Sequence, residues 1–215
     1  MILRRSVMAA GAGGAIMPRS LAAAGPRFTL DLSGVPLGGL PDGVVIARTG
    51  VGIPAEWVVR DDASVPGGRV LTQISTERTD YRFPLAIFDN VVGTDVDVSV
   101  RFKAIAGRGD RAGGLAIRLL DRDHYYVVRA NALEDNVNFY RVIKGDRQEI
   151  KGASAKVASD AWHSLGLRSV GDKFTISFNG KSLFTVADRT FPAAGRIALW
   201  TKADSITAFT ALTVR

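Results

Sequence analysis

Short runs of alternating apolar and polar residues, separated by glycine, aspartate and asparagine, recur about every 8 to 14 residues after the first 25 positions. No stretch of ten or more residues in that part of the chain shows the helical period. Many short strands with regular turn signals are typical of a sandwich or a barrel, so we expect an all-β domain with little helix. The predicted strands are 28–32, 44–49, 57–61, 70–74, 85–88, 94–105, 112–120, 125–130, 137–143, 148–153, 162–170, 173–178, 181–187, 195–201 and 206–214.

Two hairpins are indicated by their turn residues. Asn179-Gly180 separates two alternating runs, and both residue types accept the positive φ angles of a type I′ turn. Lys144-Gly145-Asp146 separates a second pair of runs in the same way. Residues 34–43, rich in Gly and Pro, are predicted to form a loop.

The first 24 residues have the three parts of a secretory signal peptide: Arg4-Arg5, an apolar stretch over 7–17, and small residues over 21–24. The arginine pair and the weakly apolar middle resemble a twin-arginine export signal, with a general secretory signal as the alternative. The apolar part is about half of the roughly 20 residues that span a membrane, so we expect no integral membrane anchor after cleavage.

We therefore expect a periplasmic or secreted protein. Its predicted parts are a signal peptide at 1–24, an N-terminal extension and loop at 25–43, and a single β-sandwich domain at 44–215.

Composition limits the chemistry open to the chain. It has no cysteine and only two histidines, which excludes disulfides, thiolate metal sites and a three-histidine metal site. The formal charge is +7, but Arg4, Arg5 and Arg19 lie in the predicted signal peptide, which has no acid; 25 basic and 21 acidic residues remain. Those basic residues are spread along the strands rather than clustered, so no nucleic-acid partner is predicted.

Strand alternation predicts which side chains point away from the core. In the strand over 112–120, Leu115, Ile117 and Leu119 would face the core. The same rule applied to the next two strands leaves a mixture of guanidinium, amide and phenol groups on one outer surface, which suits sugar hydroxyls and sugar rings. An ordinary solvated sheet face is the alternative. The predicted surface consists of Arg118, Tyr125, Arg129, Asn131, Asn138 and Tyr140.

Trp200 is predicted to join this surface as a stacking platform. Ile197 and Leu199 would point inward, which turns Trp200 outward, and Lys202 follows in the next loop. The alternative is that Trp200 covers one end of the sandwich.

No catalytic residue is assigned from the sequence. The four glutamates do not form the Glu-x-Asp-x-x-Glu pattern that would place three acids on one strand face, and the neighbours Glu134 and Asp135 would point to opposite faces. His163 is expected to be structural. Asp121, Asp123 and His124 are expected to form a polar turn, with a divalent cation as the alternative. We predict no cofactor and no metal site.

Four groups of residues carry a family resemblance: Gly113–Arg118, Asp123–Asn131, Trp162-His163 with Asn179-Gly180, and Gly195–Trp200. Together they resemble the concanavalin A-like lectin/glucanase superfamily, and most of all the 3-keto-disaccharide hydrolase domain family and its laminin-G-like relatives. The resemblance runs from about Val44 to the C-terminus. It implies a two-sheet antiparallel jelly-roll sandwich whose concave face carries Arg118, Arg129, Asn131 and Tyr140, with Trp200 and Lys202 at its margin.

Three functions follow as hypotheses. The first is an exported protein that binds a glycan or sugar derivative on its concave sheet. The second is a hydrolase or lyase acting on a 3-keto-disaccharide or a related glycoside. The third is a protein-interaction module of the cell envelope.

Overall fold

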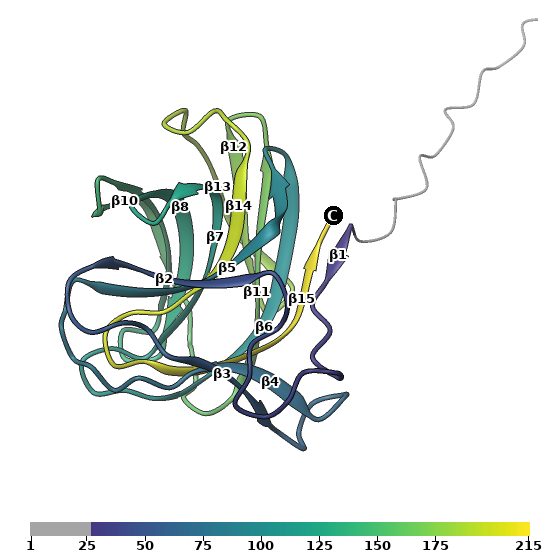
Figure 1. Ribbon diagram of the computed structural model, residues 1–215. Coiled ribbons are helices and arrows are strands. Elements are labelled where there is room, and N and C mark those ends of the chain that lie inside the picture. Colours follow the sequence, from purple (N-terminus) through teal and green to yellow (C-terminus); the bar gives the residue numbers. More distant parts are fainter. Residues whose placement is uncertain (1–26) are drawn as a thin grey trace, which may run out of the picture.

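The computed structural model describes residues 27–215, which form two antiparallel sheets packed face to face (Figure 1). Sheet A has the strand order β13-β12-β11-β6-β15-β4-β3, with β1 also paired to β15. Sheet B has the order β10-β9-β8-β7-β14-β5-β2. These residues contain no helix, and therefore none that is long and apolar enough to cross a membrane. The expected all-β jelly-roll sandwich is confirmed.

The strand bounds are close to those predicted, and β5 is the main exception because it is much longer than expected. Sheet A consists of β1 (Phe28–Thr29), β3 (Trp57–Asp61), β4 (Arg69–Gln73), β6 (Val96–Ala106), β11 (Trp162–Val170), β12 (Lys173–Phe178), β13 (Lys181–Ala187) and β15 (Ile206–Val214). Sheet B consists of β2 (Val44–Gly50), β5 (Arg82–Gly93), β7 (Ala112–Asp121), β8 (His124–Asn131), β9 (Asn136–Ile143), β10 (Asp146–Ser154) and β14 (Gly195–Trp200).

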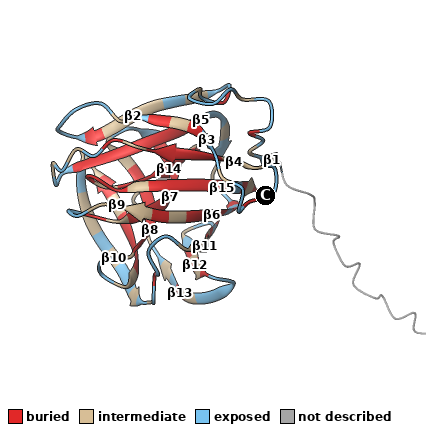
Figure 2. Ribbon diagram, turned by 90° about the horizontal axis from the view of Figure 1, so that it is seen from below, coloured by how far each residue is buried: buried red, intermediate tan, exposed pale blue. Residues whose placement is uncertain are grey.

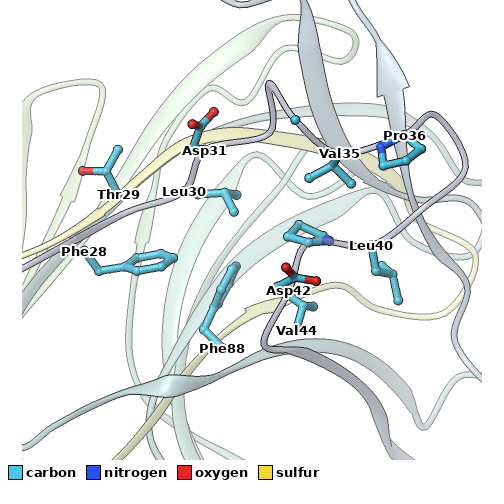
Figure 3. A pocket seen from close by; sticks show the side chains of 12 residues that line it. Phe28, Thr29, Leu30, Asp31, Val35, Pro36, Leu40, Asp42, Val44 and Phe88 are labelled. Carbon is cyan, nitrogen blue, oxygen red and sulfur yellow. The ribbon is translucent and has the colours of Figure 1, made fainter.

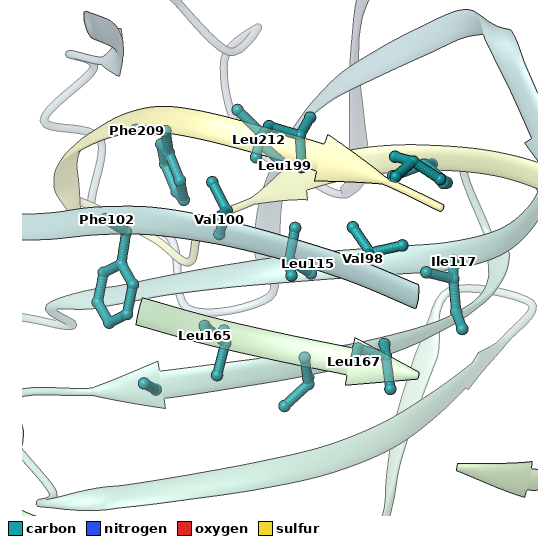
Figure 4. Close-up of a cluster of buried hydrophobic side chains, with 14 of the residues drawn as sticks. Val98, Val100, Phe102, Leu115, Ile117, Leu165, Leu167, Leu199, Phe209 and Leu212 are labelled. Carbon is teal, nitrogen blue, oxygen red and sulfur yellow. The ribbon is translucent and has the colours of Figure 1, made fainter. Parts of the chain in front are cut away.

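The main core lies between the two sheets and follows from strand alternation. In β6, Val96, Val98 and Val100 are buried, whereas Asp97 and Ser99 between them are exposed; Phe102 continues the buried row. Figure 4 shows these side chains meeting Leu115 and other residues of sheet B across the sandwich. Burial of this apolar surface, at about 25 cal/mol per Å², is the main force that holds the sheets together.

Both predicted hairpins are present. Asn179 and Gly180 have φ angles of 48° and 76°, and Lys144 and Gly145 have 52° and 81°. Two consecutive positive φ angles are the signature of a type I′ turn, whose twist matches that of the flanking strands.

The sandwich begins earlier in the chain than the predicted boundary at Val44. Phe28 of β1 pairs with Val214 of β15, and Leu32 packs into the main core. Residues 34–43 form the expected loop. The signal peptide predicted for residues 1–24 lies outside the described residues.

Candidate functional site on the concave face of sheet B

The face of sheet B that points away from sheet A is strongly concave. At one end of this face, strands from opposite sides of the sheet approach each other and close it. β10 and β5 are five positions apart in the sheet, a distance of about 24 Å if the sheet were flat. Yet the Arg147 guanidinium on β10 lies 5.0 Å from the ring centroid of Phe83 on β5. Figure 1 shows β10 and β2 at the two ends of this curved sheet. The concave face therefore has a closed end and an open end.

At the closed end, four aromatic side chains form a second core, which we call the aromatic cluster. Arg147 covers it, with its guanidinium 4.5 Å from the Tyr140 centroid and 5.7 Å from that of Trp200. Phe83 and Trp200 stack at 5.2 Å. Figure 2 shows β14 and most of β7 buried in the middle of the sheet, in contrast to β10 at its edge. The cluster consists of Phe83, Tyr125, Tyr140 and Trp200.

Trp200 points to the predicted face, but it is not the exposed stacking platform that the sequence predicts. Its exposed fraction is 0%, and its indole N–H donates a hydrogen bond of 3.3 Å to the Tyr125 hydroxyl. Gly114 on the neighbouring strand makes room for it, because a Cβ there would lie 3.2 Å from the indole. A sugar ring therefore has no access to Trp200 in this structure.

Tyr125 also points to the predicted face and is also covered. Its hydroxyl is 2.8 Å from Oγ1 of Thr49 at the end of β2, a contact that helps to close the curl. Burial raises the pKa of the Tyr125 phenol well above its ordinary value, so the group is neutral. Tyr125 therefore has a structural role and does not face a ligand.

At the open end, five polar side chains form two hydrogen-bonded groups, which together we call the polar cluster. Arg129 donates to Asn136 at 2.6 Å and to Glu134 at 2.7 Å. It also donates to the Tyr140 hydroxyl at 3.1 Å, which ties the two ends of the face together. Asn138 donates to Glu149 at 2.8 Å. The polar cluster consists of Arg129, Glu134, Asn136, Asn138 and Glu149.

The polar cluster keeps unused hydrogen-bonding capacity. Nε of Arg129 is buried without a hydrogen-bond partner within residues 27–215, so the capacity that a ligand can reach lies in the two carboxylates. Glu134 and Glu149 are both exposed. Burial tends to raise the pKa of Glu134, but the hydrogen bond and charge of Arg129 outweigh it, and the net pKa lies below its ordinary value. Glu134 is therefore ionised at neutral pH and available as a hydrogen-bond acceptor.

Lys202 and Asn131 lie beside the polar cluster around a buried carboxylate. Nζ of Lys202 is 2.8 Å from Asp80 and 3.1 Å from Asp110, and Nδ2 of Asn131 donates to Asp110 at 2.9 Å. Burial raises the pKa of Asp110 despite the neighbouring Lys202 charge. Asn131 and Lys202 are among the predicted site residues, whereas Asp110 is not.

The predicted placement of Arg118 on the concave face is wrong. Arg118 has a φ angle of 48°, and the pairing of β7 with β8 shifts register after Ile117. The shift turns the guanidinium toward the end of the sandwich, 5.0 Å from the Phe174 centroid on sheet A. There it donates to the carbonyl groups of Thr94, Phe191 and Gly171. Arg118 is a buried structural residue.

The two histidines lie away from the concave face. His163 is buried between the Ala158 carbonyl at 3.1 Å and Asn179 at 3.1 Å, a structural position. His124 contacts Asp121 at 2.9 Å within the turn between β7 and β8. The part of the chain that the structure describes holds no group of three potential metal ligands.

Sequence reasoning missed several residues of this face, of which Arg147 is the most important. Arg147 lies opposite Val142 in the β9–β10 pair, and Glu149 lies opposite Tyr140. Strand alternation carried one strand further, into β10, would have placed both side chains on the concave face.

A second hollow lies at the other side of the molecule, where the N-terminal segment crosses the edge of sheet B. This cavity of about 610 Å³ is lined by apolar side chains that include Phe28, Val35 and Phe88 (Figure 3). Among residues 27–215, Asp31 and Asp42 are the charged residues that line it. None of the predicted site residues lines it.

No protein-family model and no curated protein matches the chain. Solved structures do match. The carbohydrate-binding module CBM66 from Bacillus subtilis has a TM-score of 0.63 at 19% identity, over 81% of this chain and 97% of the module. Lectin II from Ulex europaeus has a TM-score of 0.58 at 8% identity, over 88% and 98% of the two chains. The β-glucanase of Bacillus licheniformis has a TM-score of 0.52 at 12% identity, over 83% and 94%.

These similarities confirm the predicted fold: the chain is a two-sheet antiparallel jelly-roll β-sandwich. At such low identity they show the fold alone. The closer resemblance to the 3-keto-disaccharide hydrolase domain family stays a prediction.

Proposed function

We propose that the protein binds carbohydrate at the open end of the concave face, through the polar cluster. The observation that carries this proposal is the network in which buried Arg129 holds Asn136 and the exposed carboxylate of Glu134 in fixed positions. Planar guanidinium, carboxylate and amide groups can bridge neighbouring sugar hydroxyls, and groups held in advance lose little entropy on binding. Structures of similar fold that are carbohydrate-binding or lectin proteins support the proposal.

The proposed contacts differ from the set expected from the sequence. Arg129, Asn138 and Lys202 remain as ligand contacts, and Glu134 and Glu149 join them. Asn131 acts indirectly through Asp110, and Tyr140 acts by positioning Arg129.

The test is a glycan array followed by calorimetry with Arg129→Ala and Asn138→Ala variants. Charge-assisted hydrogen bonds contribute about 1.5 to 3 kcal/mol, so we expect affinity to fall roughly tenfold or more in Arg129→Ala. Arg168→Ala, which removes an exposed arginine from β11 in sheet A, is the matched control and should bind normally. Equal binding by all three variants would refute a site in the polar cluster, and selective capture of a protein without any glycan would favour the interaction module.

Asp110 supports a second candidate function, hydrolysis or elimination on a 3-keto-disaccharide or related glycoside. A buried carboxyl group whose pKa is raised by burial, next to the ammonium group of Lys202, is the kind of group that general acid–base catalysis uses. The test is product release from 3-keto-glucosides by the wild type and by Asp110→Asn. Turnover that disappears in Asp110→Asn would support this enzymatic function. Absence of turnover by the wild type would refute it.

Export to the periplasm or the outside of the cell is also part of the proposal, and it rests on the pattern of residues 1–24. Those residues, fused to a reporter that is active only after export, should direct the reporter out of the cytoplasm. Loss of export in an Arg4→Lys, Arg5→Lys double variant would identify the twin-arginine route, and unchanged export would favour the general secretory route.

A further inference from the structure

Four turns of the chain meet at the outer side of the closed end of sheet B and line a shallow, open hollow of about 410 Å³. They are the end of β2, the residue before β5, the β7–β8 turn and the β9–β10 turn. In Figures 1 and 2, the end of β2 and the strand β10 lie on the side of the molecule away from β1 and the C-terminus. The lining residues are Gly50, Val51, Tyr81, Arg122, Asp123, Lys144, Gly145 and Asp146. We call this cavity the turn pocket.

Backbone contacts fix the walls of the turn pocket. The Val51 N–H donates to the Tyr81 carbonyl at 3.0 Å, and the Gly145 N–H donates to the Asp123 carbonyl at 3.1 Å. Gly50 has a φ angle of 78°, and a Cβ at this position would clash with the Tyr81 carbonyl oxygen. The pocket is therefore formed in advance of any ligand.

Tyr81 gives the turn pocket an open aromatic surface. Its exposed fraction is 47%, and it is the one aromatic residue among the exposed large hydrophobic residues of 27–215. Phe83 backs the ring at a centroid distance of 5.5 Å, and the Tyr81 hydroxyl donates to Asp146 at 3.2 Å. An exposed ring held in a fixed orientation is what the apolar face of a sugar needs for stacking.

The charged residues around Tyr81 are balanced. Asp123 and Asp146 provide carboxylate oxygens that accept from hydroxyl groups, whereas Arg122 and Lys144 provide donors. Two acids and two bases leave no net charge for an ionic ligand to neutralise. The volume lies within the range of pockets for small molecules, which is about 300 to 1,000 Å³.

We propose that the turn pocket is a second carbohydrate-binding site, which takes a neutral hexose ring stacked on Tyr81. This inference takes its ligand class from the proposed function, but it rests on different residues. It also assigns the stacking contact that the buried Trp200 cannot provide.

The experiment records amide chemical shifts of the full folded protein during titration with methyl glycosides of glucose, galactose and mannose, and with cellobiose and laminaribiose. The variants are Tyr81→Ala, Tyr81→Phe and, as a control at an exposed apolar position elsewhere, Val170→Ala. With a ligand that binds, shifts should appear at the four turns. Affinity should fall about tenfold or more in Tyr81→Ala, and stay within about threefold of wild type in Tyr81→Phe, which keeps the ring.

The Arg129→Ala variant separates this inference from the proposed function. Loss of binding in Tyr81→Ala but not in Arg129→Ala would support the turn pocket and refute the polar cluster. Loss in Arg129→Ala alone would refute the turn pocket and leave the proposed function intact. Shifts at both sites, each removed by its own variant, would support both, and the absence of shifts with every sugar would refute the turn pocket.

Discussion

The two faces of sheet B are equally well buried near its centre, but for different reasons. Tyr126 and Tyr125 are neighbours on β8 that point to opposite faces, and both have an exposed fraction of 0%. Tyr126 is covered by Phe174 of sheet A at a centroid distance of 4.6 Å. Tyr125 is covered by the curl of its own sheet, through Thr49 and through Trp200, which Arg147 caps. Burial on the concave face therefore depends on sheet curvature rather than on a second layer.

The largest effect that tests this comparison is the loss of Trp200. If the aromatic cluster is a true second core, Trp200→Ala should destabilise the fold by about 3 to 5 kcal/mol, as much as Phe139→Ala on the inner face. Denaturant unfolding measures both values, with Val170→Ala as a control expected to change stability by less than about 0.5 kcal/mol. A cost below about 1 kcal/mol for Trp200→Ala would mean that the concave face is loosely covered.

Arg118→Met should have the next largest effect. The methionine keeps most of the packing against Phe174 but removes the donors to three backbone carbonyl groups. We expect a loss of about 2 to 4 kcal/mol, because each unsatisfied buried acceptor costs about 1 to 3 kcal/mol. Thermal unfolding beside the Arg168→Met control measures it. A loss of stability equal to that of the control would show that Arg118 contributes no more than an exposed arginine.

Arg147→Ala should cost less, about 1 to 2 kcal/mol, because it removes a cap rather than core volume. The same variant should expose the aromatic cluster, which intrinsic tryptophan fluorescence can follow through quenching by acrylamide. Arg147→Lys should retain part of the stability. Unchanged quenching in Arg147→Ala would show that the curl closes the face without the cap.

Glu134→Gln should have the smallest effect, below about 1 kcal/mol, since the carboxylate is largely exposed and its pairing with Arg129 is screened. The pKa of Glu134 is lower in the folded state, so the ion pair stabilises the fold above the unfolded pKa of about 4.3 and loses this effect as pH falls through the folded pKa. The stability difference between Glu134→Gln and wild type should therefore vanish in acid. A difference that persists at pH 2 would place its cause outside this carboxylate.

Strand alternation predicted the direction of most site residues, because the register is regular along β8 and β9. Tyr125, Arg129, Asn131 and Asn138 all point to the expected face, paired in order across the two strands. Alternation failed at Arg118, where a residue with positive φ changes the register. No local pattern in the sequence marks that position, since arginine rarely adopts such a backbone conformation.

The cover over those side chains could not be predicted from local patterns. Contact between Arg147 and Phe83 depends on the accumulated twist of six strands, which is a property of the whole sheet. For the same reason Tyr81 was missed: the turn pocket combines four turns that are far apart in the chain. Strand alternation therefore predicts the direction of each side chain. The curvature of the whole sheet determines whether that side chain is accessible.

Because Phe28 of β1 pairs with Val214 of β15, the first and last strands of the sandwich lie side by side. The polypeptide enters and leaves the sandwich through adjacent strands, at the side remote from β10 and the end of β2 (Figure 1). A short linker between these two points should allow a circular permutant opened at the exposed Gly67 turn to fold. A tether at either end of the domain would hold the molecule at the side opposite the turn pocket and leave that pocket accessible.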